Sequence, residues 1–379
     1  MCLTTLSAAF DYKFDAFSFD PIYKEYFADR ARPDFSLSQI SYFDGYPDRV
    51  VQDTHVDVTE ENWQNNKYVK VFLFDGLIQP ENKFVALKIG DTMALARSTF
   101  IFDHWLSPIS FDISMQALLQ NFYRGSFDDN VSYDGIYFLG GTFRVGPVFS
   151  MRVGLHHYCS HYGDATLKRI RANFDEDFGQ NFYDFGFTYK YVRMNGFVVG
   201  LSLDLTPNFR IYGEYNIPPQ DINSLRPDMF APNWITRNGE VINSDYPDSY
   251  KARIISLGFE YSFNLFKNLG KTTIGYDLHM YEEGKIQYTI EKDDEDFEYY
   301  DESSDYYFAS NYYFDPDAPW ELEHNFKIAQ ELDKNISLEV AYHNGRSVMN
   351  SFFFQKTSTL TVGLRYNPDY TVNVYDSSN

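Results

Sequence analysis

Apolar and polar residues alternate with a period of two along most of the chain from about residue 108 onward. In the segment 357–366, Leu360, Val362 and Leu364 share one face, while threonines, Gly363 and Arg365 share the other. A β-strand points successive side chains to opposite faces of a sheet, so such a segment has one apolar and one polar face. The pattern therefore predicts an all-β protein, with further strands of this kind at 181–191, 320–332 and 335–342.

The connections between these strands come in two lengths that alternate along the chain. Short ones carry the Gly, Pro and Asn of tight turns and lie near Pro147, Pro207, Gly270 and Asp333. Long ones occupy 120–132, 162–180, 217–250, 282–318 and 344–356. The alternation holds only if 181–206 is a single strand. It is typical of outer-membrane barrels, which have short periplasmic turns and long outer loops.

Counting strands from these connections gives about ten between residues 108 and 366, and the segments 67–75 and 84–100 add one or two more. The sequence therefore predicts an antiparallel transmembrane β-barrel of about 12 strands, in line with the even strand numbers of such barrels. Its outer loops would be long and acidic. A soluble β-sandwich, with its apolar faces turned inward, remains the alternative.

Two features favour the barrel over the sandwich. Aromatic residues recur at strand ends, as the interfacial girdles of a barrel require; these are Tyr183, Tyr191, Tyr215, Tyr261, Phe263, Trp320 and Tyr366. The polar faces carry nearby opposite charges, which suit a lumen filled by ion pairs; the pairs are Lys190 with Asp184, Arg210 with Glu214, and Lys327 with Glu323. Such pairs would close a barrel of this size more readily than leave a wide pore.

The chain divides into an N-terminal region 1–66, a barrel 67–366 and a C-terminal tail 367–379. The first residues resemble the end of an export signal without its basic front part, and a plain disordered start is the alternative. Cys2 directly after Met1 hints at a lipidated cysteine. The rest of 1–66 shows no clear strand pattern, so it is either a periplasmic extension or a segment packed inside the barrel.

Composition narrows the choice of partners. The net charge of −22 would repel nucleic-acid phosphate, so nucleic acid is excluded as a partner. Two cysteines are too few for a disulfide framework or a four-cysteine zinc site. The loop 282–318 is crowded with carboxylates and tyrosines. It is either a solvated loop or a site for a divalent cation, which prefers oxygen ligands; no other metal and no cofactor is expected.

One stretch, "LHHYCSHYGD" at 155–164, concentrates reactive side chains. Alternation from Phe149 turns Ser150, Arg152, His156, Tyr158 and Ser160 toward the lumen. It turns His157, Cys159 and His161 toward the lipid side, at the outer rim of the barrel. A metal site on that side would need a further ligand. Ser160 and His161 face opposite ways, so His157 with Cys159 is the better-placed nucleophilic pair. The prediction preferred here is structural, with His156, Ser160 and Asp164 organising the rim through hydrogen bonds.

The same stretch resembles the H-x-S-S-H-x-G-D motif of a bacterial outer-membrane family called domain of unknown function 1207. His157, Ser160, His161, Gly163 and Asp164 match the motif, and Cys159 stands where the family has serine. The resemblance extends over about 84–366 and includes 200–215. It also includes a second motif before the last strand, formed by Asn344, Gly345, Arg346 and Ser347. It implies a barrel in the bacterial outer membrane and no particular reaction.

A second resemblance is to the outer-membrane phospholipase A group, which has a H-x-S-N-G-type nucleophile strand on its lipid-facing surface. His157 matches the histidine, but Cys159 occupies the nucleophile position and the following N-G is absent. The resemblance implies, as an alternative, a lipid hydrolase using His157 and Cys159 or Ser160. The function predicted first is non-enzymatic: a structural, surface-interaction or narrow-channel barrel of a Gram-negative-type envelope, with outer-membrane lipid as its partner.

Overall fold

The computed structural model describes most of the strands and part of the loops. The described residues are 11–45, 82–125, 129–164, 166, 192–217, 233–235, 241–243, 253–281, 284–292, 306–314, 320–352, 356–368 and 372–376. In this part of the chain, no helix is both long and apolar enough to span a membrane.

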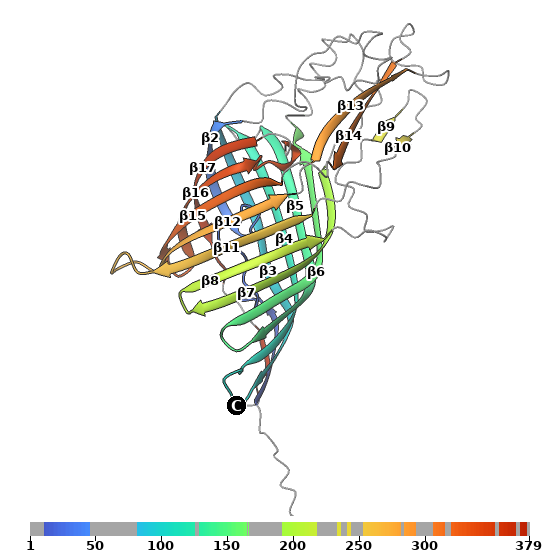
Figure 1. The fold of residues 1–379 in the computed structure, drawn as a ribbon. Helices are drawn as coiled ribbons and strands as arrows, with labels where there is room; N and C mark the ends of the chain where they lie inside the picture. The colour runs from blue at the N-terminus through green and yellow to red at the C-terminus, as the bar shows by residue number, and fades with distance from the viewer. Residues whose placement is uncertain are drawn as a thin grey trace, which may run out of the picture.

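Twelve antiparallel strands close into a barrel (Figure 1). Every strand pairs with both neighbours, and the barrel closes where the last strand, β17, pairs with the first, β2. The strands in order around the wall are β2 (Phe35–Asp44), β3 (Lys83–Ile101), β4 (Ile109–Arg124), β5 (Asn130–Val145), β6 (Phe149–Tyr162), β7 (Val192–Thr206), β8 (Phe209–Ile217), β11 (Ile254–Phe263), β12 (Thr272–Tyr281), β15 (Glu321–Asp333), β16 (Ile336–Arg346) and β17 (Lys356–Tyr366). The predicted fold class is confirmed.

The strands turn their apolar side chains outward and their polar side chains inward, the reverse of a soluble protein, as β4 illustrates. Its outward residues Phe111 and Ile113 are 50% and 56% exposed, whereas its inward residues Asp112 and Ser114 are buried. The same arrangement recurs along the other strands, which leaves a belt of exposed Leu, Ile, Phe and Val around the outside. Such a belt is stable only against lipid. The chain is therefore a transmembrane barrel rather than a soluble sandwich.

The N-terminal region is part of the wall, so the prediction that the barrel begins at residue 67 was wrong. Strand β1 (Asp11–Ser18) pairs with Ala94–Ile101 of β3, and β2 pairs with Lys83–Lys88 of the same strand. β1 and β2 therefore lie end to end along the same side of β3, and the chain leaves the wall between them. The tail 367–379 also contributes a strand, β18 (Val372–Asp376), which pairs with β1. The strands predicted at 67–75 and 181–191 lie outside the described residues.

The predicted alternation of short and long connections is present. Short turns follow β3, β5, β7, β11 and β15, and the longer connections lie at the opposite end (Figure 1). One predicted length was wrong, because β4 and β5 are separated only by residues 125–129. The loop 282–318 contains a hairpin of β13 (Gly284–Lys292) and β14 (Tyr306–Phe314). The longer connections also carry β9 (Asn233–Ile235), β10 (Val241–Asn243) and the 3₁₀ turn η1 (Asn350–Phe352).

Candidate functional site: the plug and the rim

Residues 19–34, between β1 and β2, enter the lumen and fill it; we call this segment the plug. Tyr23, Tyr26, Phe27 and Ala28 are between 1% and 4% exposed, although none of them belongs to a strand. Tyr26 stacks on Tyr212 of the wall, with ring centroids 4.1 Å apart. The alternative that the N-terminal region packs inside the barrel is thus the one observed, and burial of these aromatic rings favours the closed arrangement.

An arginine of the wall, Arg152, clamps the middle of the plug. Its Nε donates to Glu214 Oε2 at 2.6 Å, and its Nη1 lies 3.2 Å from Oε2 of Glu25 in the plug. The guanidinium also lies over the rings of Tyr23 and Tyr26, 5.2 and 5.0 Å from their centroids. A planar guanidinium can make these bonds and contacts simultaneously, which an ammonium group cannot.

The Tyr23 and Tyr26 hydroxyls extend this clamp. Tyr26 donates to Glu214 Oε2 at 3.0 Å, and the two hydroxyl oxygens are 2.7 Å apart, so Tyr23 donates to Tyr26. Burial raises the pKa of Tyr23 to about 12, with the nearby Glu214 carboxylate adding to the effect and Arg152 opposing it. The hydroxyl therefore stays protonated and remains a donor at physiological pH.

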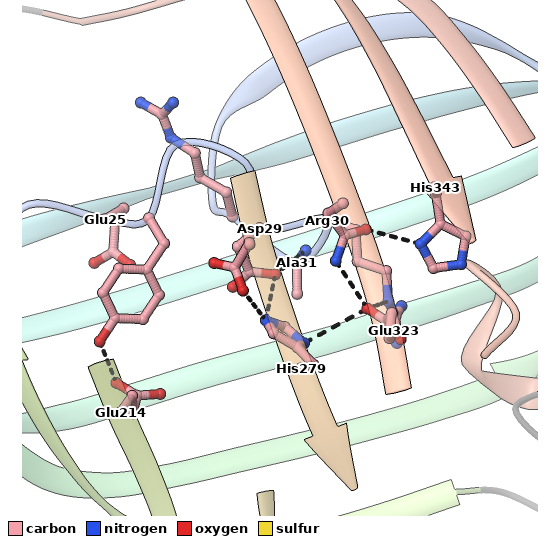
Figure 2. A network of polar contacts seen from close by, with 12 residues as sticks. Glu25, Asp29, Arg30, Ala31, Glu214, His279, Glu323 and His343 are labelled. Carbon is pink, nitrogen blue, oxygen red and sulfur yellow. Dashed lines mark hydrogen bonds and ion pairs between the residues drawn. The ribbon is translucent and has the colours of Figure 1, made fainter. Parts of the chain in front are cut away.

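The second attachment of the plug is Arg30 (Figure 2). Its Nε donates to Oε1 of Glu323 at 2.8 Å, and Glu323 is completely buried in the wall. Its Nη2 donates to Oδ1 of Asn350 at 2.9 Å. The same Glu323 carboxylate lies 3.5 Å from Nδ1 of His279, whose Nε2 is 3.9 Å from Asp29 of the plug. The plug is thus joined to the wall by charged groups inside the barrel.

Two of the three predicted ion pairs of the lumen were wrong in their partners, and the third is not tested. Lys190 and Asp184 lie outside the described residues. Arg210 pairs with Glu260 rather than Glu214, at 2.7 Å. Lys327 pairs with Glu339 rather than Glu323, at 3.1 Å. Residues four apart on a strand are separated by about 13 Å, whereas residues opposite each other on paired strands are about 5 Å apart. Arg210 and Lys327 therefore pair across strands, whereas His279 and Asp277, two residues apart on β12, lie 2.9 Å from each other along one strand.

The motif at 155–164 divides between the two faces of β6 as alternation predicts. Ser160 is completely buried on the lumen side. On the other side, the ring of His161 stacks on Tyr133 at 4.9 Å and that of His157 lies 5.9 Å from Tyr137. Cys159 is partly exposed on the same side. The histidines and the serine therefore do not converge on one site.

The lumen side of the motif belongs to a hydrogen-bond network that we call the rim network, formed by Ser132, Asp134, Ser160, Asn350 and Ser351. Ser160 donates to Asp134 Oδ1, and its oxygen is 2.8 Å from Oγ of Ser351. Asn350 Nδ2 donates to Asp134 Oδ2 at 2.7 Å, and Ser132 lies 3.0 Å from Ser351. All five side chains are at least 96% buried. Since Asn350 also binds Arg30, the rim network is continuous with the attachment of the plug.

The remaining residues of the first motif lie around this network. His156 faces Asn216, with 3.4 Å between Nδ1 and Nδ2. The Gly163 amide donates to Val131 O at 2.8 Å, and a Cβ at this glycine would lie 2.2 Å from Asn130 O. This close approach explains why glycine stands there. Asp164 directly follows, is exposed, and is not a member of the rim network.

The second motif lies on the opposite side of the same end of the barrel. Asn344 donates to Ser358 at 2.6 Å. Gly345 has φ +152°, and a Cβ there would lie 2.7 Å from Cα of Glu323, so the position favours glycine. Arg346 donates to Glu321 at 2.6 Å, and Ser347 accepts from the Met349 amide at 3.2 Å. The motif therefore leads the chain into the segment that contributes Asn350 and Ser351.

Sequence reasoning missed four members of the rim network: Ser132, Asp134, Asn350 and Ser351. The first two lie on the neighbouring strand and the last two closely follow the second motif, and only strand register and loop path bring them to Ser160. The pairing of Asp134 with Ser160 across β5 and β6 is a consequence of that register. No local pattern at these positions signals the contact.

No group of three or more His, Cys, Asp or Glu side chains in the described part of the chain is placed to hold a metal ion. Of the acidic residues of 282–318, where a divalent cation was the alternative to a solvated loop, only the backbone of Glu291 is described. Both alternatives remain predictions.

Solved structures of outer-membrane proteins resemble this fold at low sequence identity. Outer membrane phospholipase A from Escherichia coli has 10% identity and a TM-score of 0.42, with 88% of this chain and 92% of that chain covered. The Salmonella typhi phospholipase dimer with bound calcium has 10% identity and a TM-score of 0.43, covering 93% and 94%. The NanC porin has 9% identity and a TM-score of 0.35, covering 76% and 93%.

No family model matches the chain, and neither does any curated protein. Structural similarity at such low identity and TM-score gives no information about the functional site. The closed, inside-out barrel of antiparallel strands is the architecture of bacterial outer-membrane proteins. The chain is an outer-membrane β-barrel.

Replacing Asp134 by alanine should destabilise the barrel by about 1–3 kcal/mol, because Ser160 and Asn350 would lose their common buried acceptor. The measurement is the temperature at which the folded, fast-migrating form is lost on a gel, compared with Asp103→Ala in an exposed turn. An unchanged transition temperature in Asp134→Ala would contradict a stabilising rim network.

Proposed function

We propose that this barrel is kept closed by its plug and serves as a structural or surface-interaction protein of the outer membrane. The observation that carries the proposal is the plug itself, which is buried among wall side chains and joined to them through Arg152 and Arg30. Among the described residues, the plug side chains fill space inside the lumen, which leaves less room for a large solute to pass. The longer connections at one end then form the part available to partners.

Planar-bilayer recording tests the proposal. We expect refolded wild-type protein to insert without a steady wide-pore conductance, because the plug occupies the lumen. Insertion is verified independently by protease protection and by heat-modifiable migration. A stable conductance in every inserted wild-type molecule, of the size of an empty barrel of this strand number, would contradict it.

A second function, lipid hydrolysis, is supported by one observation. Ser160 is buried and bonded to Asp134, so of the two nucleophiles considered only Cys159 shares the lipid-facing side with His157. In a Cys–His pair of this kind the histidine takes the thiol proton, which activates the sulfur for acyl transfer.

The test is turnover of labelled phospholipid in mixed micelles. If this site is an enzyme, Cys159→Ala and His157→Ala each lose turnover by a factor of about 100 or more, while His161→Ala, on the same face, keeps it. Absence of turnover in wild type, or equal turnover in all variants, removes hydrolysis at this site and leaves the closed structural barrel.

Membership of the family called domain of unknown function 1207 remains a prediction. It is supported by the two motifs, whose glycines occupy positions of close backbone approach. The proposed structural role of both motifs does not depend on that membership.

A further inference from the structure

A cavity of about 80 Å³ lies between the plug and one side of the barrel wall. The plug contributes Ala28, Arg30 and Asp34 to its lining. The wall contributes residues of β2, β3, β4, β15, β16 and β17. A single water needs roughly 10–15 Å³ of such space, so the cavity has room for a small organic molecule.

Two polar side chains on neighbouring strands face this cavity with unused hydrogen-bonding capacity. Lys88 Nζ donates to the plug carbonyls of Arg30 and Arg32, at 2.6 and 3.4 Å, and among the described residues it has no carboxylate partner. Gln120 stands directly opposite Lys88 in the β3–β4 pairing and is only 6% exposed. Within the described part of the chain, the Gln120 amide has no hydrogen-bond partner.

The Gln120 amide is open to the cavity, so a molecule held there can make hydrogen bonds with it. The charges around the cavity indicate what that molecule is. Its lining holds three cationic side chains, Arg30, Lys88 and Lys327, against two carboxylates, Asp34 and Glu339. Glu339 is already engaged by Lys327 at 3.1 Å and by Arg365 at 2.5 Å. Arg30 is likewise engaged by Glu323 at 2.8 Å, so Lys88 is the lining cation that has no carboxylate partner among the described residues.

We propose that this cavity binds a small organic monocarboxylate. Its carboxylate accepts from the Lys88 ammonium and from the Gln120 amide, and its hydrocarbon part lies against the apolar lining residues Ile40, Ala86 and Val348. A charge-assisted hydrogen bond of this kind is among the stronger ones in proteins. The site goes beyond a purely structural role, because it gives the closed barrel a ligand held between its plug and its wall.

Acetate is the probe, and its binding to the refolded protein is measured by isothermal titration and saturation-transfer NMR. Wild type should bind acetate saturably and acetamide, which lacks the charge, at least about 10-fold more weakly. Lys88→Gln should weaken acetate binding by about 10-fold or more, while Lys83→Gln, an exposed lysine on the same strand, leaves it unchanged.

A second variant keeps the test independent of folding defects. Gln120→Glu supplies its own carboxylate to Lys88, so it should fold normally by heat-modifiable migration and yet lose acetate binding. The proposal is overturned if wild type shows no saturable acetate binding, if acetamide binds equally well, or if Gln120→Glu binds acetate like wild type. These outcomes are separate from the conductance test, since a closed barrel can lack the ligand site.

Discussion

Replacing Arg30 by methionine will release the plug and turn a closed barrel into a conducting one. The substitution keeps an apolar stem but leaves the completely buried Glu323 carboxylate without the guanidinium 2.8 Å away. Removing one partner of a buried ion pair costs about 3–5 kcal/mol, because the remaining charge is desolvated and uncompensated. Of the other groups near Glu323, Asn325 and Tyr281 supply only neutral hydrogen bonds, at 3.1 and 3.2 Å. His279 Nδ1 lies farther away, at 3.5 Å, and is shared with Asp277 through its other ring nitrogen.

The measurement is single-molecule conductance in a planar bilayer, with Lys24→Met as the control. Lys24 belongs to the same plug but its side chain is exposed, so its loss should leave the barrel closed. Glu323→Gln combined with Arg30→Met removes both charges and should close the barrel again in part. A closed Arg30→Met barrel that is as stable as wild type would show that the plug is held by other contacts.

Replacing Arg152 by methionine will destabilise the closed barrel at least as much as Arg30→Met. Two carboxylates, Glu25 of the plug and Glu214 of β8, would lose their common guanidinium. The rings of Tyr23 and Tyr26 would lose the nearer of the two guanidinium groups that lie over them, and that of Arg210 would remain. We expect a loss of about 3–5 kcal/mol for the uncompensated charges, with a contribution of about 0.5–2 kcal/mol from the cation–π contacts.

The readouts are conductance and the temperature at which the folded form is lost on a gel. Lys356→Met is the control, because Lys356 also lies beside a carboxylate, Glu321 at 3.8 Å, but its side chain is 71% exposed. Its loss should cost no more than about 1 kcal/mol. Equal effects of Arg152→Met and Lys356→Met would contradict a special role for Arg152.

The barrel itself could be predicted from the sequence because most strands expose one apolar face to lipid. The alternation pattern did not predict strand β2, and the reason is physical. Its outward face carries Gln39 and Ser41 beside Leu37 and Phe43, and its inward face buries Ile40 and Tyr42 under the plug. Both faces therefore mix apolar and polar residues, and no alternation is visible.

The plug could not be predicted as such, because residues 19–34 have no regular secondary structure and thus no periodic signature. Its place is determined by tertiary contacts with wall residues such as Arg152, Arg210 and Glu323, which are far away in the sequence. For the motif at 155–164, alternation correctly separated Ser160 from His157 and His161. The partners Asp134 and Ser351 depend on strand register and loop path, which single segments do not encode.

The position of the plug can be measured directly by thiol protection at Ala28, which is 3% exposed and packs beside Ala329 and Phe27. Ala28→Cys is introduced into a background with Cys2 and Cys159 replaced by serine, and a charged, membrane-impermeant maleimide is added to the folded protein. We predict that Cys at position 28 reacts at least about 100-fold more slowly than Lys334→Cys in an exposed turn, and at full speed after denaturation. Equal rates at positions 28 and 334 in the folded barrel would contradict a plugged lumen.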